Sequence, residues 1–416
     1  MKNLCSTFLG ASIAAITFGG NAAIASDDFT DALVGGKAKV DMNLRYETVE
    51  QDNDSEDATA LTLRTRLTYL TKEFQGFSAV VEMEDSRIVG GQDEFTVGPT
   101  GFNPGQYSVI ADPETTELDQ AYLQYKNGMF VGKLGRQVIT LDNHRFVGHV
   151  GWRQDRQTFD AANLTITPAE GFKASYIHIG KRNRIFAQAA DLESKDHLFN
   201  LSYKTPVGTI VGYSYMLELD NDTDNALDTI GLRFSGATPI ADGVKLLYTA
   251  EFATQEFEGI DPKTDLQAEY EADYTALELG ISASGFTGKI GYELLGSDDG
   301  NYIFDTPLAT LHKFNGWADL FIVNPQVRFP EGIVDTYVSA SYAFNGGKGG
   351  NLTAVYHSFD SDEDRAAGDT LGTELDVVYG YKFNKHYSVG AKAAFYSADD
   401  FAVDTDKIWL WFNISF

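Results

Sequence analysis

The sequence predicts an all-β protein, a transmembrane antiparallel β-barrel of about 18 strands with short periplasmic turns and long extracellular loops. Three observations predict this fold. Apolar and polar side chains alternate over segments of about ten residues, short and long connections alternate between these segments, and the aromatic last segment ends in Phe416. Because the hydrocarbon layer of a membrane holds no water to pair with backbone groups, such a sheet must close on itself.

The segment at residues 60–70, ALTLRTRLTYL, shows how the alternation assigns faces. Consecutive side chains of a strand point to opposite sides, so Leu61, Leu63 and Leu67 share one face while Arg64 and Arg66 share the other. An arginine that faces lipid near the bilayer midplane costs roughly 2–4 kcal/mol, so we expect both arginines to face the lumen. The same parity places further polar side chains inward and predicts a charged, wet lumen: Arg45, Glu47, Glu82, Glu84, Gln120, Tyr122, Gln124, Lys126, Glu374, Asp376, Lys382 and Lys392.

Eighteen segments follow the alternating pattern, and this even number returns both chain ends to the periplasm. They begin near residues 37, 60, 77, 117, 129, 157, 172, 196, 209, 227, 244, 270, 286, 334, 351, 371, 386 and 407. Short connections at 205–208, 285 and 384–385 separate long polar ones at 89–116, 137–156 and 295–333. A soluble sandwich has no reason to sort its connections in this way. Without a plug domain, only inward-folded long loops can narrow a barrel of this size.

The first 25 residues predict a secretory signal peptide, with one lysine, an apolar stretch and the cleavage pattern Ala23-Ile24-Ala25 before Ser26. Cleavage leaves 416 − 25 = 391 residues, and we expect residues 26–416 to form one barrel domain in the cell outer membrane, beside lipid and lipopolysaccharide. The single cysteine, Cys5, lies in the removed segment, which excludes disulfides and thiolate metal sites from the mature chain. The C-terminal Phe416 resembles the signal that the outer-membrane assembly machinery recognises.

The formal net charge of −28 becomes −29 without Lys2, which argues against a nucleic-acid partner. The acidic stretch that starts at Asp220 imitates a calcium loop, but Asn225 and Gly231 occupy positions six and twelve, so it is not an EF-hand. Such acidic loop tips either hold divalent cations weakly beside lipopolysaccharide or are simply solvated.

Residues 142–160, DNHRFVGHVGWRQDRQTFD, crowd charged side chains into one long connection. Two interpretations stay open. Arg145, Arg153 and Arg156 create a positive field in a narrow channel that attracts anions, or they pair with Asp142 and Asp155 in a solvated loop.

The histidines of the chain indicate neither a metal site nor an enzyme. His144 and His149 are five residues apart in a loop and lack an obvious third ligand, so we expect no metal. His178 and His197 lie on or beside strands, and spacing assigns them no serine nucleophile. We therefore expect no catalysis and no cofactor.

Two stretches resemble the alginate export family of bacterial outer-membrane proteins: GRQVITLDNHRFVGHVGWRQDRQTFDA at 135–161 and YELLGSDDGNYIFDTPLATLHKFNGWADLFI at 292–322. The resemblance implies an 18-stranded barrel whose basic lumen conducts a negatively charged uronate polymer. The matching positions are Arg136, Arg145, Arg153 and Asp160, with Trp152 and Trp317 in structural or sugar-contacting roles. The acidic side chains expected in the lumen depart from a uniformly basic passage.

The sequence thus predicts a passive outer-membrane channel for anionic solutes or uronate-containing saccharides. Its expected pore-lining residues are Arg45, Arg64, Arg66, Arg136, Arg145, Arg153 and Arg156. The first alternative is a general diffusion porin that filters mainly by size. The second is a barrel enzyme or adhesin with a closed lumen.

Overall fold

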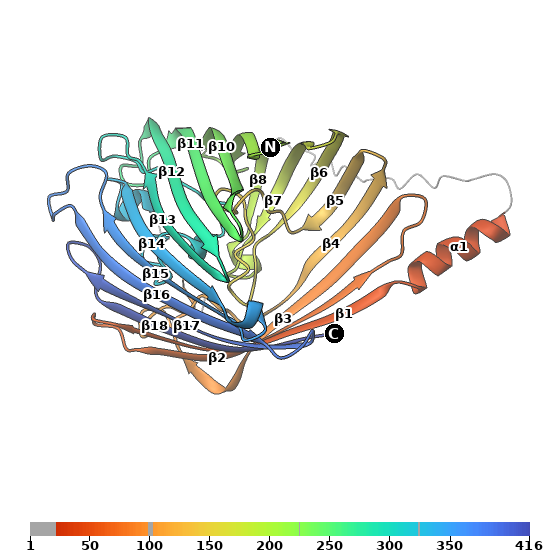
Figure 1. Cartoon of the computed structure of the whole chain (residues 1–416), viewed down its shortest axis with the longest axis horizontal. Coiled ribbons are helices and arrows are strands. Elements are labelled where there is room, and N and C mark those ends of the chain that lie inside the picture. The colour runs from red at the N-terminus through yellow and green to blue at the C-terminus, as the bar shows by residue number, and fades with distance from the viewer. Residues whose placement is uncertain (1–21, 99–102, 224, 323–324) are drawn as a thin grey trace, which may run out of the picture.

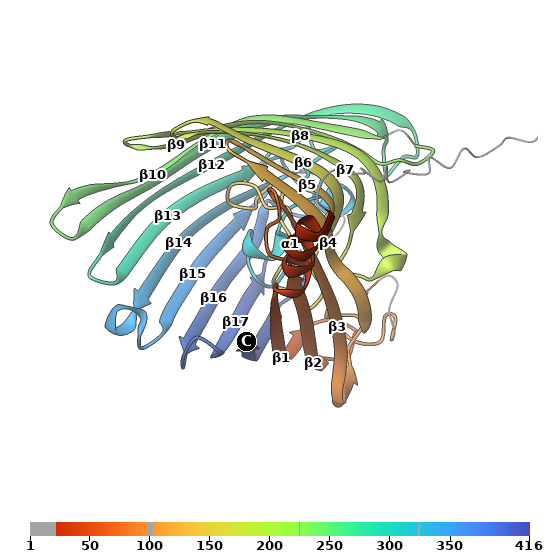
Figure 2. The same cartoon turned by 90° about the vertical axis from the view of Figure 1, so that its right-hand side faces the viewer.

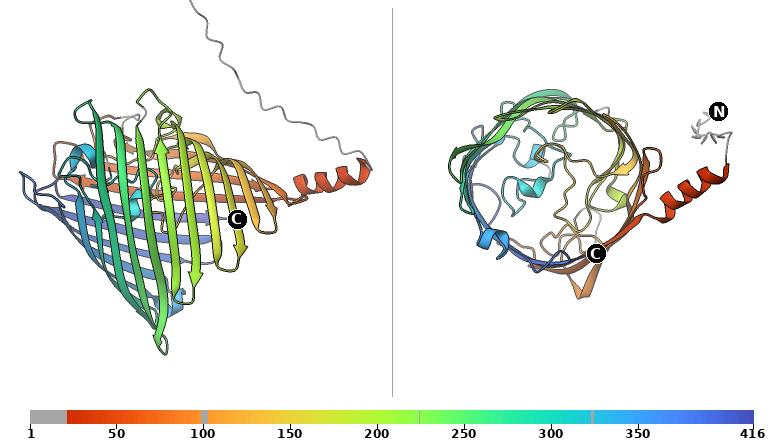
Figure 3. Two further views of the ribbon diagram at one scale, coloured as in Figure 1. Left: turned by 90° about the horizontal axis from the view of Figure 1, so that it is seen from above. Right: turned by 45° about the vertical axis from the view of Figure 1, so that its right-hand side comes forward.

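The computed structural model describes residues 22–98, 103–223, 225–322 and 325–416 (Figure 1). In this part of the chain, eighteen strands form one antiparallel sheet that closes into a barrel, because β1 pairs with both β2 and β18. Figure 3 shows the closed ring from the side and obliquely along its interior. The predicted fold class is confirmed. Among the described residues, no helix has both the length and the hydropathy that a membrane-spanning helix requires.

Every strand pairs with its neighbours in the sequence. The strands are β1 Lys37–Gln51, β2 Ala58–Leu70, β3 Phe77–Glu94, β4 Thr115–Asn127, β5 Phe130–Gln137, β6 Thr158–Ala169, β7 Phe172–Asn183, β8 Leu192–Thr205, β9 Gly208–Glu218, β10 Ala226–Ala241, β11 Val244–Ile260, β12 Gln267–Ala283, β13 Phe286–Leu295, β14 Ile333–Ala343, β15 Asn351–Asp360, β16 Thr370–Lys382, β17 Tyr387–Ala398 and β18 Thr405–Ser415. The largest difference from the predicted starts is at β8, which begins at 192 rather than 196. A register shift between Ile179 and Lys181 of β7 explains it, because an irregular pairing interrupts the alternation of the sequence.

The two faces of the wall carry the side chains that the alternation predicts. On β2, Leu67 is 54% exposed toward lipid, whereas its neighbour Arg66 is only 8% exposed and faces the lumen. Arg45, Glu47 and Glu84 are likewise buried on the inner face. The inner wall is therefore charged, as predicted, but much of it is covered rather than bathed in water.

The covering comes from the three longest connections, at 95–114, 138–157 and 296–332, which lie on the extracellular side. Figure 3 shows segments inside the ring, including the cyan segment that contains the short helices η2 Leu311–Lys313 and α2 Pro325–Arg328. A parallel bridge joins Val147 to Leu308, so loop 138–157 and loop 296–332 are paired with each other. The predicted long loops are therefore present and fold inward.

An apolar cluster inside the barrel holds these loops against the wall. Phe146 packs against Tyr213 and Tyr274 of the wall and against Phe304 of loop 296–332, with ring centroids 5.1–5.7 Å apart. Leu308 is fully buried in the same cluster. Burial of this kind stabilises the inward position of both loops, since apolar surface gains free energy when it leaves water.

A helix precedes the barrel, which the sequence did not indicate. The helix α1 Ala22–Val34 projects from the rim at the start of β1 (Figure 1) and is seen nearly end-on in Figure 2. The carbonyl of Ala32 accepts a hydrogen bond from the Lys72 amide, and Phe29 meets Phe74 edge-on. The first four residues of the helix, 22–25, lie before the predicted cleavage point after Ala25. Residues 1–21 lie outside the described part of the chain, and the signal peptide stays a prediction.

Candidate functional site

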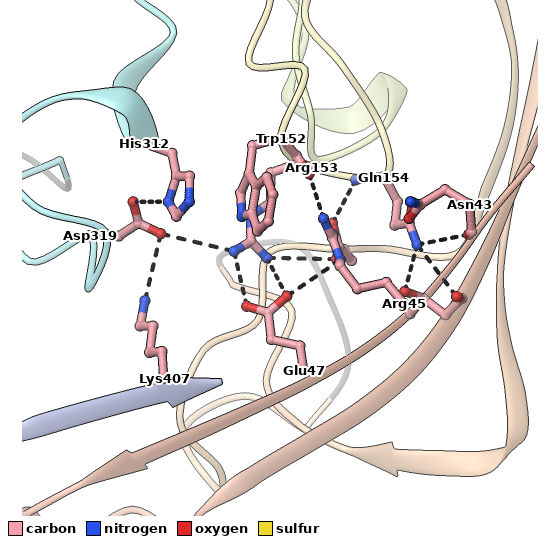
Figure 4. Close-up of polar contacts among 11 residues, drawn as sticks. Asn43, Arg45, Glu47, Trp152, Arg153, Gln154, His312, Asp319 and Lys407 are labelled. Atoms are coloured by element: carbon pink, nitrogen blue, oxygen red, sulfur yellow. Dashed lines mark hydrogen bonds and ion pairs between the residues drawn. The ribbon is translucent and has the colours of Figure 1, made fainter. Parts of the chain in front are cut away.

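Arg153 of loop 138–157 joins that loop to the barrel wall (Figure 4). Its guanidinium donates two hydrogen bonds, of 2.9 and 3.1 Å, to the Glu47 carboxylate on β1. Asp112 of loop 95–114 lies 3.6 Å away, and Asp319 of loop 296–332 lies 3.9 Å away. Arg153 thus connects one strand and all three long loops, and it is only 5% exposed.

Arg45 completes this network from the wall. It forms an ion pair with Asp112, donates a hydrogen bond to the Trp152 carbonyl, and lies 3.7 Å from Glu47. Two arginines therefore share two carboxylates, each about as buried as the arginines themselves. Buried charges are tolerated when they are paired and hydrogen-bonded in this way.

Two further predicted arginines, Arg66 and Arg156, form a second network near β2 to β4. Arg66 pairs with Glu84 and lies 3.6 Å from Asp119, while Arg156 of loop 138–157 pairs with Glu82 and, at 2.7 Å, with Asp119. This network fastens the second half of loop 138–157 to the wall. Toward the periplasmic side, Arg64 pairs with Asp41 at 2.5 Å.

The remaining two predicted arginines differ in their surroundings. Arg145 is 2% exposed and donates hydrogen bonds to Glu293 of β13 at 2.8 Å and to Asn315 of loop 296–332 at 3.0 Å. Arg136 forms two hydrogen bonds with Asp160 at 2.7 and 3.1 Å and is more exposed.

The structure therefore brings Arg45 and Arg153 together, and Arg66 and Arg156 together, and gives every predicted arginine a carboxylate partner. The partners of the loop arginines belong to the wall and to the other loops, not to Asp142 and Asp155, so the interpretation of pairing within a solvated loop is wrong. Asp142 instead accepts a hydrogen bond from Asn200. Contact of the arginines with cargo stays a prediction.

Loop 296–332 is held by a cluster of residues whose proximity could not be predicted from the sequence. His312 shares a hydrogen bond of 2.7 Å with Asp319 through Nδ1 and accepts one of 2.6 Å from Lys392 of β17 through Nε2. Lys407 of β18 lies 3.6 Å from Asp319. All four tryptophans of the chain gather here: Trp152, Trp317, Trp409 and Trp411.

The rings in this tryptophan cluster surround the Lys392 ammonium group. Its nitrogen lies 3.6 Å from the ring centre of Trp317 and 4.2 Å from that of Trp152, and Trp152 stacks on His312 at 4.9 Å. A cation over the face of an indole ring is attracted by the ring quadrupole. The cluster thus joins both long loops to β17 and β18.

The motif Phe314-Asn315-Gly316-Trp317-Ala318-Asp319, which carries the family resemblance, is the docking segment of this loop. The Glu374 carboxylate accepts hydrogen bonds from the amides of Trp317 and Ala318, at 2.5 and 2.8 Å, and Asp376 accepts a longer one of 3.2 Å from Trp317. The inward carboxylates of β16, predicted from parity, therefore bind the loop backbone. The alternation of side chains predicts which residues of β16 face inward, but it does not predict their contact with the loop.

Gly316→Ala is expected to loosen loop 296–332. Gly316 has φ +81°, and an added Cβ would lie 2.3 Å from the Glu374 carboxylate. The left-handed conformation alone costs an alanine about 1–2 kcal/mol, and the clash adds to that. A red shift of tryptophan emission would report the loosening, whereas Gly243→Ala, with φ +69° and open space around it, should leave the emission unchanged. An unshifted spectrum of the Gly316 variant would contradict the expectation.

Acidification is expected to weaken the docking of loop 296–332. Burial, with the charges of Lys392 and Arg153, lowers the pKa of His312 to about 3. Burial alone would raise the pKa of Asp319, but His312, Lys407 and Arg153 hold it well below its usual range. Both groups bind protons more readily when the loop is released, so docking is lost as pH falls from about 6.5 toward 3. Tryptophan emission measured from pH 7 to 4 checks this, and a flat profile would overturn it.

The histidines singled out in the sequence are not part of these networks. The rings of His144 and His149 meet edge-on at 5.6 Å, and burial lowers the pKa of His149 to about 4. The rings of His178 and His197 stack at 4.8 Å; Nδ1 of His178 is hydrogen-bonded to the Asp196 carbonyl, and Nδ1 of His197 to the Tyr176 hydroxyl. Within the described ranges, no three His, Cys, Asp or Glu side chains are placed to hold a metal ion.

Comparisons with known proteins agree with this architecture. The family model described as "Alginate export" matches residues 35–268, more than half of the chain. No curated protein matches. Among solved structures, OccAB1 of Acinetobacter baumannii superposes with a TM-score of 0.70 at 13% identity, covering 92% of this chain and 97% of that one. OccAB4 of the same organism superposes with a TM-score of 0.68 at 18% sequence identity, covering 91% of this chain and 97% of that one. OpdL of Pseudomonas aeruginosa superposes with a TM-score of 0.67 at 15% sequence identity, covering 92% of this chain and 98% of that one.

The structural likenesses are at low identity and establish the fold, while the family model establishes the family. The barrel closure and the alternating faces are those of a protein that crosses the outer membrane with strands. The chain is an outer-membrane β-barrel channel and belongs to the alginate export family.

Proposed function

We propose that this protein is a passive channel for anionic solutes, in particular for saccharides that contain uronate units. The family to which it belongs is named for alginate export, and alginate is a polyuronate. Cargo would diffuse down its concentration gradient with no covalent step. The observation that carries the proposal is the inward position of the three long loops, which forces cargo to pass close to fixed, charged side chains.

We expect the passage to be narrow because the loops that fold into it are held in place by the barrel wall. Buried ion pairs join the loops to β1, β3, β13 and β18. Loops that are held by ion pairs to several strands keep one position inside the barrel, so every solute that passes meets the same side chains. Selection then depends on charge and on shape, and not on size alone.

Ion selectivity and sugar flux test the proposal. In planar bilayers under a salt gradient, we expect a reversal potential on the anion side. In liposome swelling, glucuronate should enter faster than glucose, which has nearly the same size and no charge. Cation preference, together with slower entry of glucuronate, would reject the proposal.

One observation favours the rival, a general diffusion porin. Each arginine that was expected to attract anions is already paired with a carboxylate, so these arginines add little net positive charge to the passage. If this balance governs passage, glucuronate and glucose should enter liposomes at equal rates. The swelling experiment therefore decides between the two functions.

A further inference from the structure

A cavity of about 460 Å³ lies inside the barrel, against the inner faces of β10 to β15. Thr287, Ser341 and Thr353 line it toward the periplasmic turns, while Asn143 and Lys313 belong to the two inward loops. Its volume falls in the range of about 300–1,000 Å³ that is typical of small-molecule sites. None of the seven arginines expected to line the pore belongs to its lining.

Three cations face this cavity from three different elements: Arg233 of β10, Lys289 of β13 and Lys313 of loop 296–332. Arg233 forms an ion pair with Glu251, and Lys289 forms one with Glu278 at 2.9 Å. Lys313 donates a hydrogen bond to the Asn143 carbonyl at 2.9 Å. In the part of the chain that the structure describes, no carboxylate lies within 4.0 Å of Lys313.

The other carboxylates that line the cavity already have partners. Glu293 binds Arg145, and Asp335 shares a hydrogen bond of 2.8 Å with His357. Lys313 therefore has no ion-pair partner of its own, and Glu278, which attracts it from farther away, is already paired with Lys289. Burial lowers the pKa of Lys313, and the charges of Arg233 and Lys289 lower it further against the opposing charge of Glu278, so Lys313 is repelled by the other two cations. An anion placed among them would relieve this repulsion.

The rest of the lining suits a sugar. Phe314, Trp317 and Tyr337 present aromatic rings, against which the C–H face of a sugar ring can pack. Hydroxyl groups of Thr287, Ser339, Ser341 and Thr353 offer hydrogen-bond donors and acceptors. Aromatic surface, hydroxyl groups and one unmatched cation together match the chemistry of a sugar that carries a single carboxylate.

We propose that this cavity is a binding site for an acidic sugar unit, with Lys313 as the main contact for its carboxylate and Lys289 and Arg233 in support. The inference rests on the proposed function and deepens it, because it moves the point of cargo recognition from the arginine networks to the wall of β10 to β14. Arg153 and Arg156 then hold the loops, and Lys313 contacts the cargo.

Equilibrium binding to the purified, detergent-solubilised full-length protein tests the site without requiring conduction. Trp317 lines the cavity, so titration with glucuronate should change tryptophan emission in a saturable way, while glucose at the same concentrations should bind much more weakly. Lys313→Gln should weaken glucuronate binding by about tenfold, the effect of losing one charge-assisted hydrogen bond. Lys313→Arg should restore much of it.

A matched control is available at Lys385, an exposed lysine in the turn between β16 and β17. Lys385→Gln removes the same charge and should leave glucuronate binding unchanged. Equal affinity of the wild type and the Lys313→Gln variant for glucuronate would overturn the site. Weaker binding in Lys313→Gln alone supports it even if bilayer recordings show no anion preference, in which case the proposed function fails and the site stands.

Discussion

Arg153→Ala is expected to release loop 138–157 from the barrel wall and to raise the single-channel conductance. The substitution leaves Glu47 and Asp112 buried at 1% exposure with only Arg45 to neutralise both. Removing one partner of a buried ion pair typically costs about 3–5 kcal/mol, because the remaining charge stays uncompensated. That free energy opposes docking of the loop, not closure of the barrel, since the ladder of β1 with β2 and β18 contains no Arg153 contact.

Single-channel recording and tryptophan emission measure this release together. Conductance and current noise should rise, and emission should shift to the red because Trp152 leaves its stack on His312. Arg87→Ala is the matched control, since Arg87 forms an exposed pair with Asp85 that contributes little to stability. If the Arg153 and Arg87 variants conduct alike, Arg153 does not fasten the loop.

The wall could be predicted from the sequence because a barrel strand is a local pattern. The alternation in ALTLRTRLTYL assigns Arg64 and Arg66 to the lumen with no knowledge of their partners, and both are found there. Errors occur where the backbone departs from regular pairing. A register shift between Glu82 and Met83 of β3, opposite Leu118 and Gln120 of β4, lets Asp119 face the lumen beside Gln120, which simple alternation excludes.

The arrangement of the loops could not be predicted, because it depends on contacts between distant residues. Arg153 lies 106 positions from Glu47, and Arg145 lies 170 positions from Asn315. Parity shows that a carboxylate faces inward but not which loop it binds. The motif around Trp317 could be identified in the sequence as a family signature. That its backbone amides donate hydrogen bonds to Glu374 could not be predicted, because the two segments meet only in the folded barrel.

Charge and apolar packing have different roles in placing the loops. The cluster around Phe146 supplies non-directional burial, which favours any compact arrangement. The ion pairs at Glu47, Glu82 and Glu293 are directional, and a shifted loop would leave them unpaired. We expect the apolar cluster to keep the loops inside the barrel and the ion pairs to select one arrangement.

Arg145→Met is expected to move the ion selectivity of the channel toward cations. Arg145 neutralises Glu293, which lines the cavity, and it also binds Asn315 of the loop. Methionine keeps much of the side-chain volume and packs beside Phe314 and Tyr274, so the loop retains apolar contacts while Glu293 loses its counter-charge.

The reversal potential under a salt gradient measures the Arg145→Met effect, with Arg145→Lys as the variant that keeps the charge. Lysine preserves the charge of Arg145 but not its planar fork, so the Asn315 contact should weaken while the wild-type selectivity is maintained. An unchanged reversal potential in Arg145→Met would mean that the charge of Glu293 does not affect the ions that pass through the channel. A shift in both variants would instead mean that loop position, rather than the charge balance at Glu293, sets selectivity, because only the geometry of the contact is common to the two substitutions.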